Sequence, residues 1–276
     1  MKNLLIAFPV VALLLTACTK EPSLENGNGT PASGGGAAKL VQMGVRAGTD
    51  STTTNFVYSG AVLSEITDDG TVNGQSFDLQ SKIKRNSANL ITSLTTISSI
   101  FPQIGLDDSL VMNFVIDNAK SQYIYGVSHY SFMGQPVADS IVYSYDASGK
   151  LVTMITYFDD GTGYSPDTKE EYTYNGSNLA TIKSYTDVGA GFTLDATTTY
   201  EFDTKVNPMQ FAADAPVLGM GDFYSANNAT KKTVVATSPA ATTITSVAYT
   251  YNSNNQPATG VNTSGSSTST VTYHYQ

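Results

Sequence analysis

Tryptophan is absent from this chain of 276 residues, cysteine occurs once and histidine twice. A single cysteine cannot form a disulfide within the chain, so burial and hydrogen bonding must stabilise the fold. Charged residues make up 13% of the sequence, against about 25% in ordinary soluble domains. The net charge is −9, which makes nucleic acids and anionic headgroups poor partners. Hydroxyl, amide, glycine and tyrosine residues take up the polar surface instead, as in exported β proteins.

The first apolar stretch, from Leu4 to Leu15, is shorter than the roughly 20 apolar residues that cross a bilayer. One lysine precedes it and small residues follow it, which is the pattern of a secretory signal peptide. The sequence Leu15-Thr16-Ala17-Cys18 resembles the lipobox of bacterial lipoproteins. That resemblance implies cleavage before Cys18 and acylation of its thiol. We therefore predict a signal peptide over residues 1–17 and lipidation at Cys18; the alternative is an ordinary signal peptide with an incidental cysteine.

A tether is predicted next, over residues 18–38. The stretch from Thr19 to Ala38 is rich in Gly, Ser, Pro and Asn and has almost nothing to bury. As a Gly-rich coil of about 20 residues it would span on the order of 25 Å. Residues 39–276 are long enough for one large all-β domain.

A short motif repeats seven times beyond the tether. Each copy is a triplet with apolar residues at its first and third places, followed by a turn residue, as in Tyr143-Ser144-Tyr145-Asp146. The second copy departs from the pattern with arginine in the third place. The first five steps between copies are 27 to 31 residues and the last is 49. The third places are Tyr58, Arg85, Ile116, Tyr145, Tyr174, Phe202 and Tyr251.

Each copy predicts the end of a β-strand. Its first and third side chains share one face, since strand side chains alternate with period two. In Asp146-Ala147-Ser148-Gly149 an Asp opens and a Gly closes a type I turn, with Gly149 expected at positive φ. An apolar strand then returns, so one unit is a hairpin with its link to the next. About seven hairpin repeats predict an all-β fold: a large, highly twisted, antiparallel up-and-down meander of roughly fourteen to sixteen strands, forming an open or partly closed sheet.

Two stretches depart from the regular pattern of hairpins. Ser87 to Phe101 has apolar residues at helical spacing, but its many Ser and Thr residues favour a strand. Asn207 to Lys232 contains two prolines and several glycines, which predicts an irregular excursion with one helical turn.

The phrase Tyr143-Ser144-Tyr145-Asp146-Ala147-Ser148-Gly149-Lys150-Leu151 resembles the YD repeat, with Lys150 where that family usually has Arg. The leader, the tether and the Tyr-x-Tyr-Asp/Asn hairpins together resemble Bacteroidetes lipoproteins that carry a domain of unknown function described as having a porin-like fold. The resemblance covers most of residues 50–276. It implies a twisted β-meander and supplies no catalytic residues.

The sequence nominates no catalytic, metal or cofactor site. His129 and His274 sit beside tyrosines in strand-like sequence and lack metal-ligand spacing. The acidic pairs at 68–69, 107–108, 159–160 and 170–171 are adjacent rather than alternating, which suits hairpin turns better than calcium loops. Hydrolase, metalloprotease, nucleotide and dinucleotide fingerprints are absent from the sequence. We expect no enzymatic activity and no cofactor.

We predict a lipid-anchored, non-catalytic binding module of the outer envelope, with a glycan, a protein or a hydrophobic small molecule as partner. The main alternative is a periplasmic carrier with a hydrophobic ligand in a cavity of the sheet. A third class is a transmembrane barrel, for which the sequence has no aromatic girdles. Thr19 after the cysteine predicts export to the outer membrane. Lys20-Glu21 partly resembles the tag of surface lipoproteins, which favours the cell surface over the periplasmic face.

Overall fold

The computed structural model describes residues 38–209, 214–218 and 224–276. Within these ranges it contains sixteen strands and one 3-10 helix, and no helix there is long and apolar enough to span a membrane. The elements are β1 (Leu40–Ala47), β2 (Asp50–Ser59), β3 (Val62–Val72), β4 (Gln75–Arg85), β5 (Ile91–Ile97), η1 (Phe101–Ile104), β6 (Ser109–Asp117), β7 (Gln122–Phe132), β8 (Gln135–Tyr145), β9 (Leu151–Asp159), β10 (Tyr164–Asn175), β11 (Asn178–Asp187), β12 (Phe192–Val206), β13 (Asn227–Thr237), β14 (Ala240–Tyr251), β15 (Pro257–Ser264) and β16 (Ser267–Tyr275).

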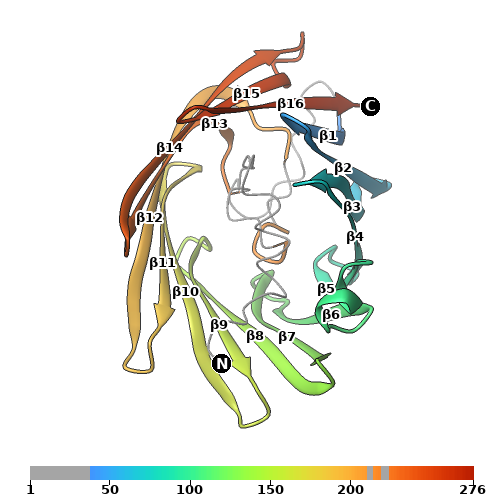
Figure 1. Cartoon of the computed structure of the whole chain (residues 1–276), viewed down its shortest axis with the longest axis vertical. Helices are drawn as coiled ribbons and strands as arrows, with labels where there is room; N and C mark the ends of the chain where they lie inside the picture. The colour runs from blue at the N-terminus through green and yellow to red at the C-terminus, as the bar shows by residue number, and fades with distance from the viewer. Residues whose placement is uncertain (1–37, 210–213, 219–223) are drawn as a thin grey trace.

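The strands form a closed antiparallel barrel in which each pairs with its neighbours in sequence. β1 and β16 complete the ring, with Leu40 opposite Tyr275 and Arg46 opposite Thr270 (Figure 1). The prediction of an open or partly closed sheet of about seven hairpins is therefore wrong. The seven motif copies mark only turns between β2 and β15, so they contain no information on the pairing of β1 with β16. Closure leaves no unpaired edge in the sheet.

Each of the seven motif copies contains a β-bulge. At the third residue of every copy the strand register shifts against the returning strand, which is the mark of a β-bulge. Bulges bend a strand and increase its twist. All seven bulges lie next to the motif turns, so the added bend and twist are concentrated at one end of the barrel.

The turn after Tyr145 has the expected geometry. Gly149 has φ +86° and donates its N–H to the Asp146 carbonyl at 3.1 Å, which confirms the prediction. Asn86 to Asn89 and Asn252 to Asn255 form the same turn, with Asn89 and Asn255 at positive φ. Asparagine tolerates this conformation better than other side chains, so two copies do without glycine.

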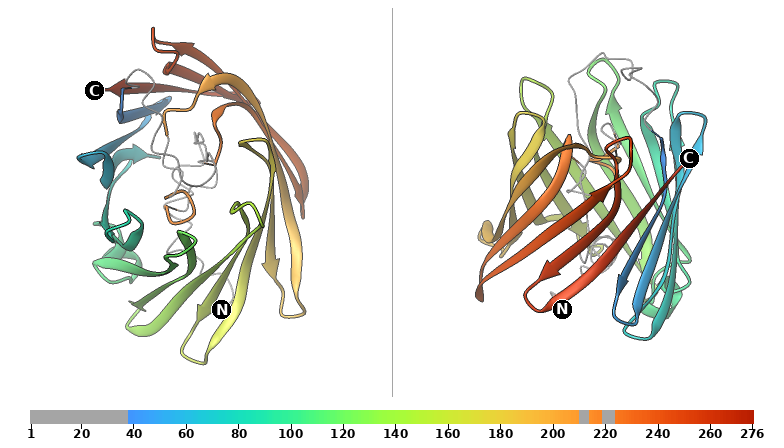
Figure 2. Two further views of the ribbon diagram at one scale, coloured as in Figure 1. Left: turned by 180° about the vertical axis from the view of Figure 1, so that it is seen from behind. Right: turned by 90° about the horizontal axis from the view of Figure 1, so that it is seen from above.

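The two ends of the barrel differ, and we name them by their residues. The tyrosine end holds the seven motif turns and both termini of the sheet, Leu40 and Tyr275. The glycine end holds the other links, at residues 48–49, 73–74, 98–108, 133–134, 160–163, 188–191, 238–239 and 265–266. Seven of these eight links contain a glycine at positive φ. Figure 2 shows the barrel of Figure 1 from behind and from above.

Within the described residues the first irregular stretch behaves as predicted, and the second is shorter than predicted, because residues 227–232 belong to strand β13. Ser87 to Phe101 contains strand β5, and the buried Phe101 then starts η1. The excursion after β12 ends at residue 226, where β13 begins. Its described part at 214–218 is one turn, in which the Leu218 N–H donates to the Asp214 carbonyl at 2.9 Å. This turn lies inside the ring of strands (Figure 1). The predicted signal peptide, Cys18 and the tether up to residue 37 lie outside the described residues.

Candidate functional site

The barrel wall has a hydrophilic outer face along β2 to β4. Side chains alternate between the two faces of a closed barrel, and the buried Thr54 and Phe56 face inward on β2. The register carries this alternation to the neighbouring strands. The outward residues of these three strands are Ser51, Thr53, Asn55, Val57, Glu65, Thr67, Asp69, Thr71, Ser76, Asp78, Gln80, Lys82 and Lys84. Charges and hydroxyls therefore cover this part of the exterior.

A row of apolar residues crosses one sector of the outer face. Val115, Tyr125, Val142 and Ile155 lie opposite one another across β6 to β9. The row continues to Lys169 on β10, whose amine pairs with Glu171, so it ends at a charged strand. Further exposed apolar side chains lie on β13 to β15: Val235, Ile244 and Val261.

Tyrosine hydroxyls tie neighbouring hairpins together at the tyrosine end. The Tyr58 hydroxyl donates to the Leu40 carbonyl at 2.8 Å, and the Tyr174 hydroxyl donates to the Leu151 carbonyl at 2.9 Å. Burial raises the pKa of Tyr58 to about 12, which keeps the hydroxyl a donor. In these two copies the third residue thus satisfies a main-chain carbonyl at the start of a neighbouring hairpin strand.

Arg85 takes this role in the copy that departs from the pattern. Its Nε and Nη2 donate to the Leu63 carbonyl at 3.0 and 2.8 Å. The same guanidinium binds both carboxylate oxygens of Asp214 on the internal turn, at 2.8 and 2.6 Å. Both side chains are at most 10% exposed. Arginine therefore replaces tyrosine where the wall also needs a charge to hold the internal segment.

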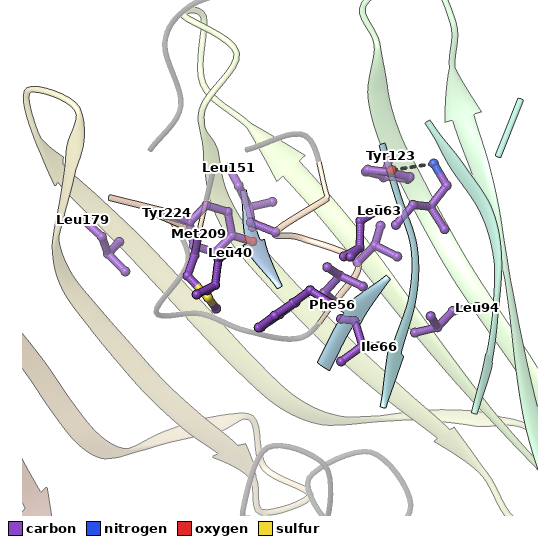
Figure 3. Close-up of a cluster of buried hydrophobic side chains, with 14 of the residues drawn as sticks. Leu40, Phe56, Leu63, Ile66, Leu94, Tyr123, Leu151, Leu179, Met209 and Tyr224 are labelled. Carbon is purple, nitrogen blue, oxygen red and sulfur yellow. Dashed lines mark hydrogen bonds between the residues drawn. The ribbon is translucent and has the colours of Figure 1, made fainter. Parts of the chain in front are cut away.

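The internal segment is the described part of the chain between β12 and β13, at 207–209, 214–218 and 224–226, and it packs inside the tyrosine end of the barrel. Met209 and Tyr224 are almost fully buried and pack with wall residues in one hydrophobic cluster (Figure 3). The Tyr224 ring lies 5.6 Å from Tyr172 and 6.5 Å from Tyr174, between centroids. At the base of the segment the Ser225 hydroxyl accepts from the Leu179 N–H at 2.9 Å. Sixteen-stranded barrels are too wide for wall side chains alone to fill, and here described residues between β12 and β13 supply part of the core.

Towards the glycine end the inner face becomes polar. Thr243 faces inward with Val234 and Thr198 in register, yet it is exposed, so solvent reaches the inner face there. The buried polar residues that face inward are Thr54, Asp68, Ser81, Thr96, Ser128, Asp139, Thr198 and Asn262. A small apolar cluster of Leu79, Phe101, Leu106 and Leu110 covers one corner of this end. The inner face thus changes from apolar to hydroxyl-rich and acidic along the barrel.

Two inward carboxylates have perturbed acidity. Burial raises the pKa of Asp68 to about 6, although the Thr54 hydroxyl donates to its carboxylate. Burial also raises the pKa of Asp139 to about 6, although the Tyr130 hydroxyl donates to Oδ2 at 2.9 Å. Perturbed acids of this kind gather at binding and catalytic sites as well as in structural networks.

The residues considered from sequence do not form a metal centre. His129 and His274 are exposed on the outer face of β7 and β16. Asp68 and Glu170 face inward while their neighbours Asp69 and Glu171 face outward. Asp159 and Asp160 accept hydrogen bonds from the backbone of their own turn. Within the described ranges no group of three His, Cys, Asp or Glu side chains could hold a metal ion.

Sequence reasoning missed the interior residues that distinguish this barrel. In the sequence Arg85 is only a departure from the repeat, and its partner Asp214 is 129 residues away. Asp139 was not singled out. A usable signal was present: carboxylates at positions whose strand neighbours two residues away are apolar fall on the buried face.

Comparison with known proteins supports the architecture. No protein-family model and no curated protein matches the chain. A porin-like protein from Bacteroides uniformis is similar in structure, with 13% sequence identity and a TM-score of 0.52 over 87% of this chain and 98% of that one. A porin-like protein from Bacteroides vulgatus has 10% identity and a TM-score of 0.54 over 87% and 99%. The fold is porin-like. At these identities the likeness describes the fold and not the activity.

Proposed function

We propose that this porin-like barrel is a non-catalytic binding module of the outer envelope that stands in water, anchored by a lipid on Cys18. The observation that carries the proposal is the polarity of the wall. Transmembrane barrels present an apolar band about 25 Å tall around their whole circumference. Here the outer face of β2 to β4 is mostly charged or hydroxylated, with Val57 as an exception, so an apolar band does not run around the whole wall. The burial of Ile66 beside the outward Glu65 and Thr67 is one example.

The inner face supports a binding role near the glycine end. A hydrophobic-ligand carrier requires an apolar interior that is free to receive its ligand. In this barrel the internal segment packs into the apolar half, with Tyr224 only 2% exposed. The remaining inner face is hydroxyl-rich and acidic, and solvent reaches it at Thr243. These features favour a polar ligand over a lipid-like one.

Cell fractionation tests the placement. Wild-type protein should sediment with outer membranes, and Cys18→Ser should move to the soluble fraction, since the lipid would be the main attachment. Reconstituted wild-type protein should give no ion conductance in a planar bilayer. A Cys18→Ser protein that stays in the membrane after an alkaline wash, together with conductance, would identify a membrane-spanning barrel and contradict the proposal.

Orientation and ligand class need separate measurements. Surface placement, supported by the tether and by Lys20-Glu21, predicts that protease added to intact cells degrades the barrel domain. Survival until the outer membrane is breached would place it on the periplasmic face. Mass spectrometry of purified protein should find no bound lipid; a stoichiometric co-purifying lipid would support the carrier instead.

A further inference from the structure

The seam between β1 and β16 is built like a motif hairpin without its turn. Tyr275 lies opposite Leu40, and the register shifts on the β1 side of this pair. Tyr145 and Leu151 have the same pairing and the same shift within one motif hairpin. The Tyr275 hydroxyl also donates to the Pro257 carbonyl of the neighbouring hairpin at 2.7 Å. The end of the chain thus supplies an eighth motif strand, and β1 is its return strand.

The start of the described chain is fixed where this eighth hairpin would have its turn. The backbones of Lys39 and Gln276 exchange two hydrogen bonds, at 3.1 and 3.0 Å. The side-chain amide of Gln256 donates to the Ala38 carbonyl at 2.8 Å. The Lys39 ammonium group donates to the Gly60 carbonyl of the next hairpin turn. The predicted tether therefore joins the barrel at the tyrosine end.

The two ends of the barrel also carry opposite charge. Each end is defined here as its links together with the last two residues of the strands on either side. Among the described residues, the tyrosine end has six basic and three acidic residues: Lys39, Lys84, Arg85, Lys120, Lys150 and Lys205, and Asp117, Asp146 and Asp214. The glycine end has one basic and six acidic residues: Arg46, and Asp50, Asp107, Asp108, Asp159, Asp160 and Asp187. The negative charge of the barrel is thus concentrated at the end away from the tether.

Only the end closer to a lipid surface responds to its charge. The field of a charged surface fades within about 8 Å at physiological salt. A strand of eleven residues such as β8 spans about 35 Å, so the far end of the barrel lies well outside this distance. An anionic surface attracts lysine and arginine side chains near it and repels aspartates. The net negative charge of the chain therefore does not prevent its basic end from approaching such a surface.

We propose that the tyrosine end faces the lipid surface of the outer membrane, with its lysines towards anionic headgroups, and that the glycine end points away. The inference rests on the proposed lipid anchor and names the part of the barrel that meets the membrane. The tether and the charge of the barrel both favour this orientation. The polar inner face, which solvent reaches at Thr243 near the glycine end, then opens on the side opposite the membrane.

Energy transfer to a labelled lipid measures the orientation. The acylated protein is reconstituted on vesicles of phosphatidylcholine and phosphatidylglycerol that contain a rhodamine-labelled lipid. Cys18 is the only cysteine of the chain, so a donor dye on Ala147→Cys or Ala190→Cys labels one end alone. Both alanines are exposed, Ala147 in a turn of the tyrosine end and Ala190 in a link of the glycine end. Transfer from position 147 should exceed transfer from position 190.

Charge reversal separates the effect of the lysines from that of the tether. Lys84→Glu/Lys120→Glu should reduce the difference in transfer on these vesicles and leave it unchanged on phosphatidylcholine alone. Lys82→Glu/Lys183→Glu is the matched control, since it reverses two exposed lysines of the wall that lie outside the tyrosine end. The control should change the difference much less. An equal change in both double variants would contradict the role of the lysines.

Failure of the orientation and failure of the proposed function give different results. Equal transfer from positions 147 and 190, or greater transfer from position 190, would overturn the orientation and leave the lipid anchor in place. A wild-type protein that does not float with the vesicles would contradict the anchor, and the orientation would fall with it.

Discussion

The tyrosine end and the glycine end of the barrel use the same sixteen strands for different purposes. At the tyrosine end the inward side chains are large and apolar, every motif copy carries a bulge, and an internal segment fills the interior. At the glycine end many inward side chains are hydroxylated or acidic, apart from the small cluster around Phe101, and most links are short glycine turns. The difference shows that the repeated hairpin determines the sheet that forms the wall. The residues that face inward determine which part of the barrel interior is packed hydrophobic core. The predictions below test this division.

The largest effect is expected from the buried ion pair of the tyrosine end. Arg85→Met leaves Asp214 as an uncompensated buried charge and the Leu63 carbonyl without its donor, at a cost of about 3–5 kcal/mol of unfolding free energy. Urea unfolding measures it. The matched control is Lys231→Met in the exposed Lys231–Glu201 pair, which should cost less than about 1 kcal/mol.

The double variant Arg85→Met/Asp214→Leu separates the cost of the unpaired Asp214 charge from the cost of the unpaired Leu63 carbonyl. Replacing both charges with apolar side chains should recover much of the loss, since no unpaired charge remains. A double variant as unstable as Arg85→Met alone would show that the Leu63 carbonyl, and not the charge of Asp214, dominates the cost.

Truncation of an inward side chain should depend on its end of the barrel. Leu179→Ala at the tyrosine end removes a side chain of 0% exposure and should cost about 2–5 kcal/mol. Thr243→Ala on the inner face at the glycine end should change stability by no more than about 0.5 kcal/mol. Equal effects in thermal and urea unfolding would mean that the glycine end is also packed core.

The acidic glycine half should respond to pH with a defined sign. The pKa of Asp68 is raised to about 6, so between its unfolded value near 4 and about 6 the folded state binds more protons. Its destabilising contribution therefore grows as pH rises through this window and is complete above it. Asp68→Asn should stabilise the protein by about 2 kcal/mol at pH 7.5 and by little at pH 4.

Asp69→Asn is the matched control, since it removes the neighbouring outward carboxylate of the same strand. It should stabilise far less at pH 7.5, because it relieves only the smaller repulsion of Asp68 by Asp69. Urea unfolding at both pH values measures the difference. An Asp68→Asn variant with unchanged stability at pH 7.5 would show that this carboxylate is hydrated in solution.

The smallest effect concerns one motif turn. Gly149→Val places a β-branched residue at φ +86° and should lower stability by about 1–2 kcal/mol. A Cβ at this position would meet only Gln122 Nε2, at 3.5 Å, so the cost comes from the backbone and not from crowding. Ser144→Val on the adjacent outward strand position is the control and should be nearly neutral. Equal melting temperatures for Gly149→Val and wild type would contradict the turn.

Local patterns predicted much of the wall. The alternation around Tyr143 and Tyr145, the Asp146 turn and the glycine at positive φ follow from steric and hydrogen-bonding rules that act within a few residues. The candidate site could not be predicted in the same way. Ser128 and Asp139, for example, face each other on the inner face only because β7 pairs with β8 in this register.

The sequence by itself determined an all-β chain, its antiparallel up-and-down order, the places of its seven turns and which side chains share a face. Each of these depends on neighbours close in the chain. Only the tertiary structure decided that β1 pairs with β16, that the interior receives the segment holding Asp214 and Tyr224, and that Arg85 binds it. These contacts join residues from about 50 to more than 200 positions apart. Their free energy comes from closing sheet edges and burying side chains together, and no local pattern records it.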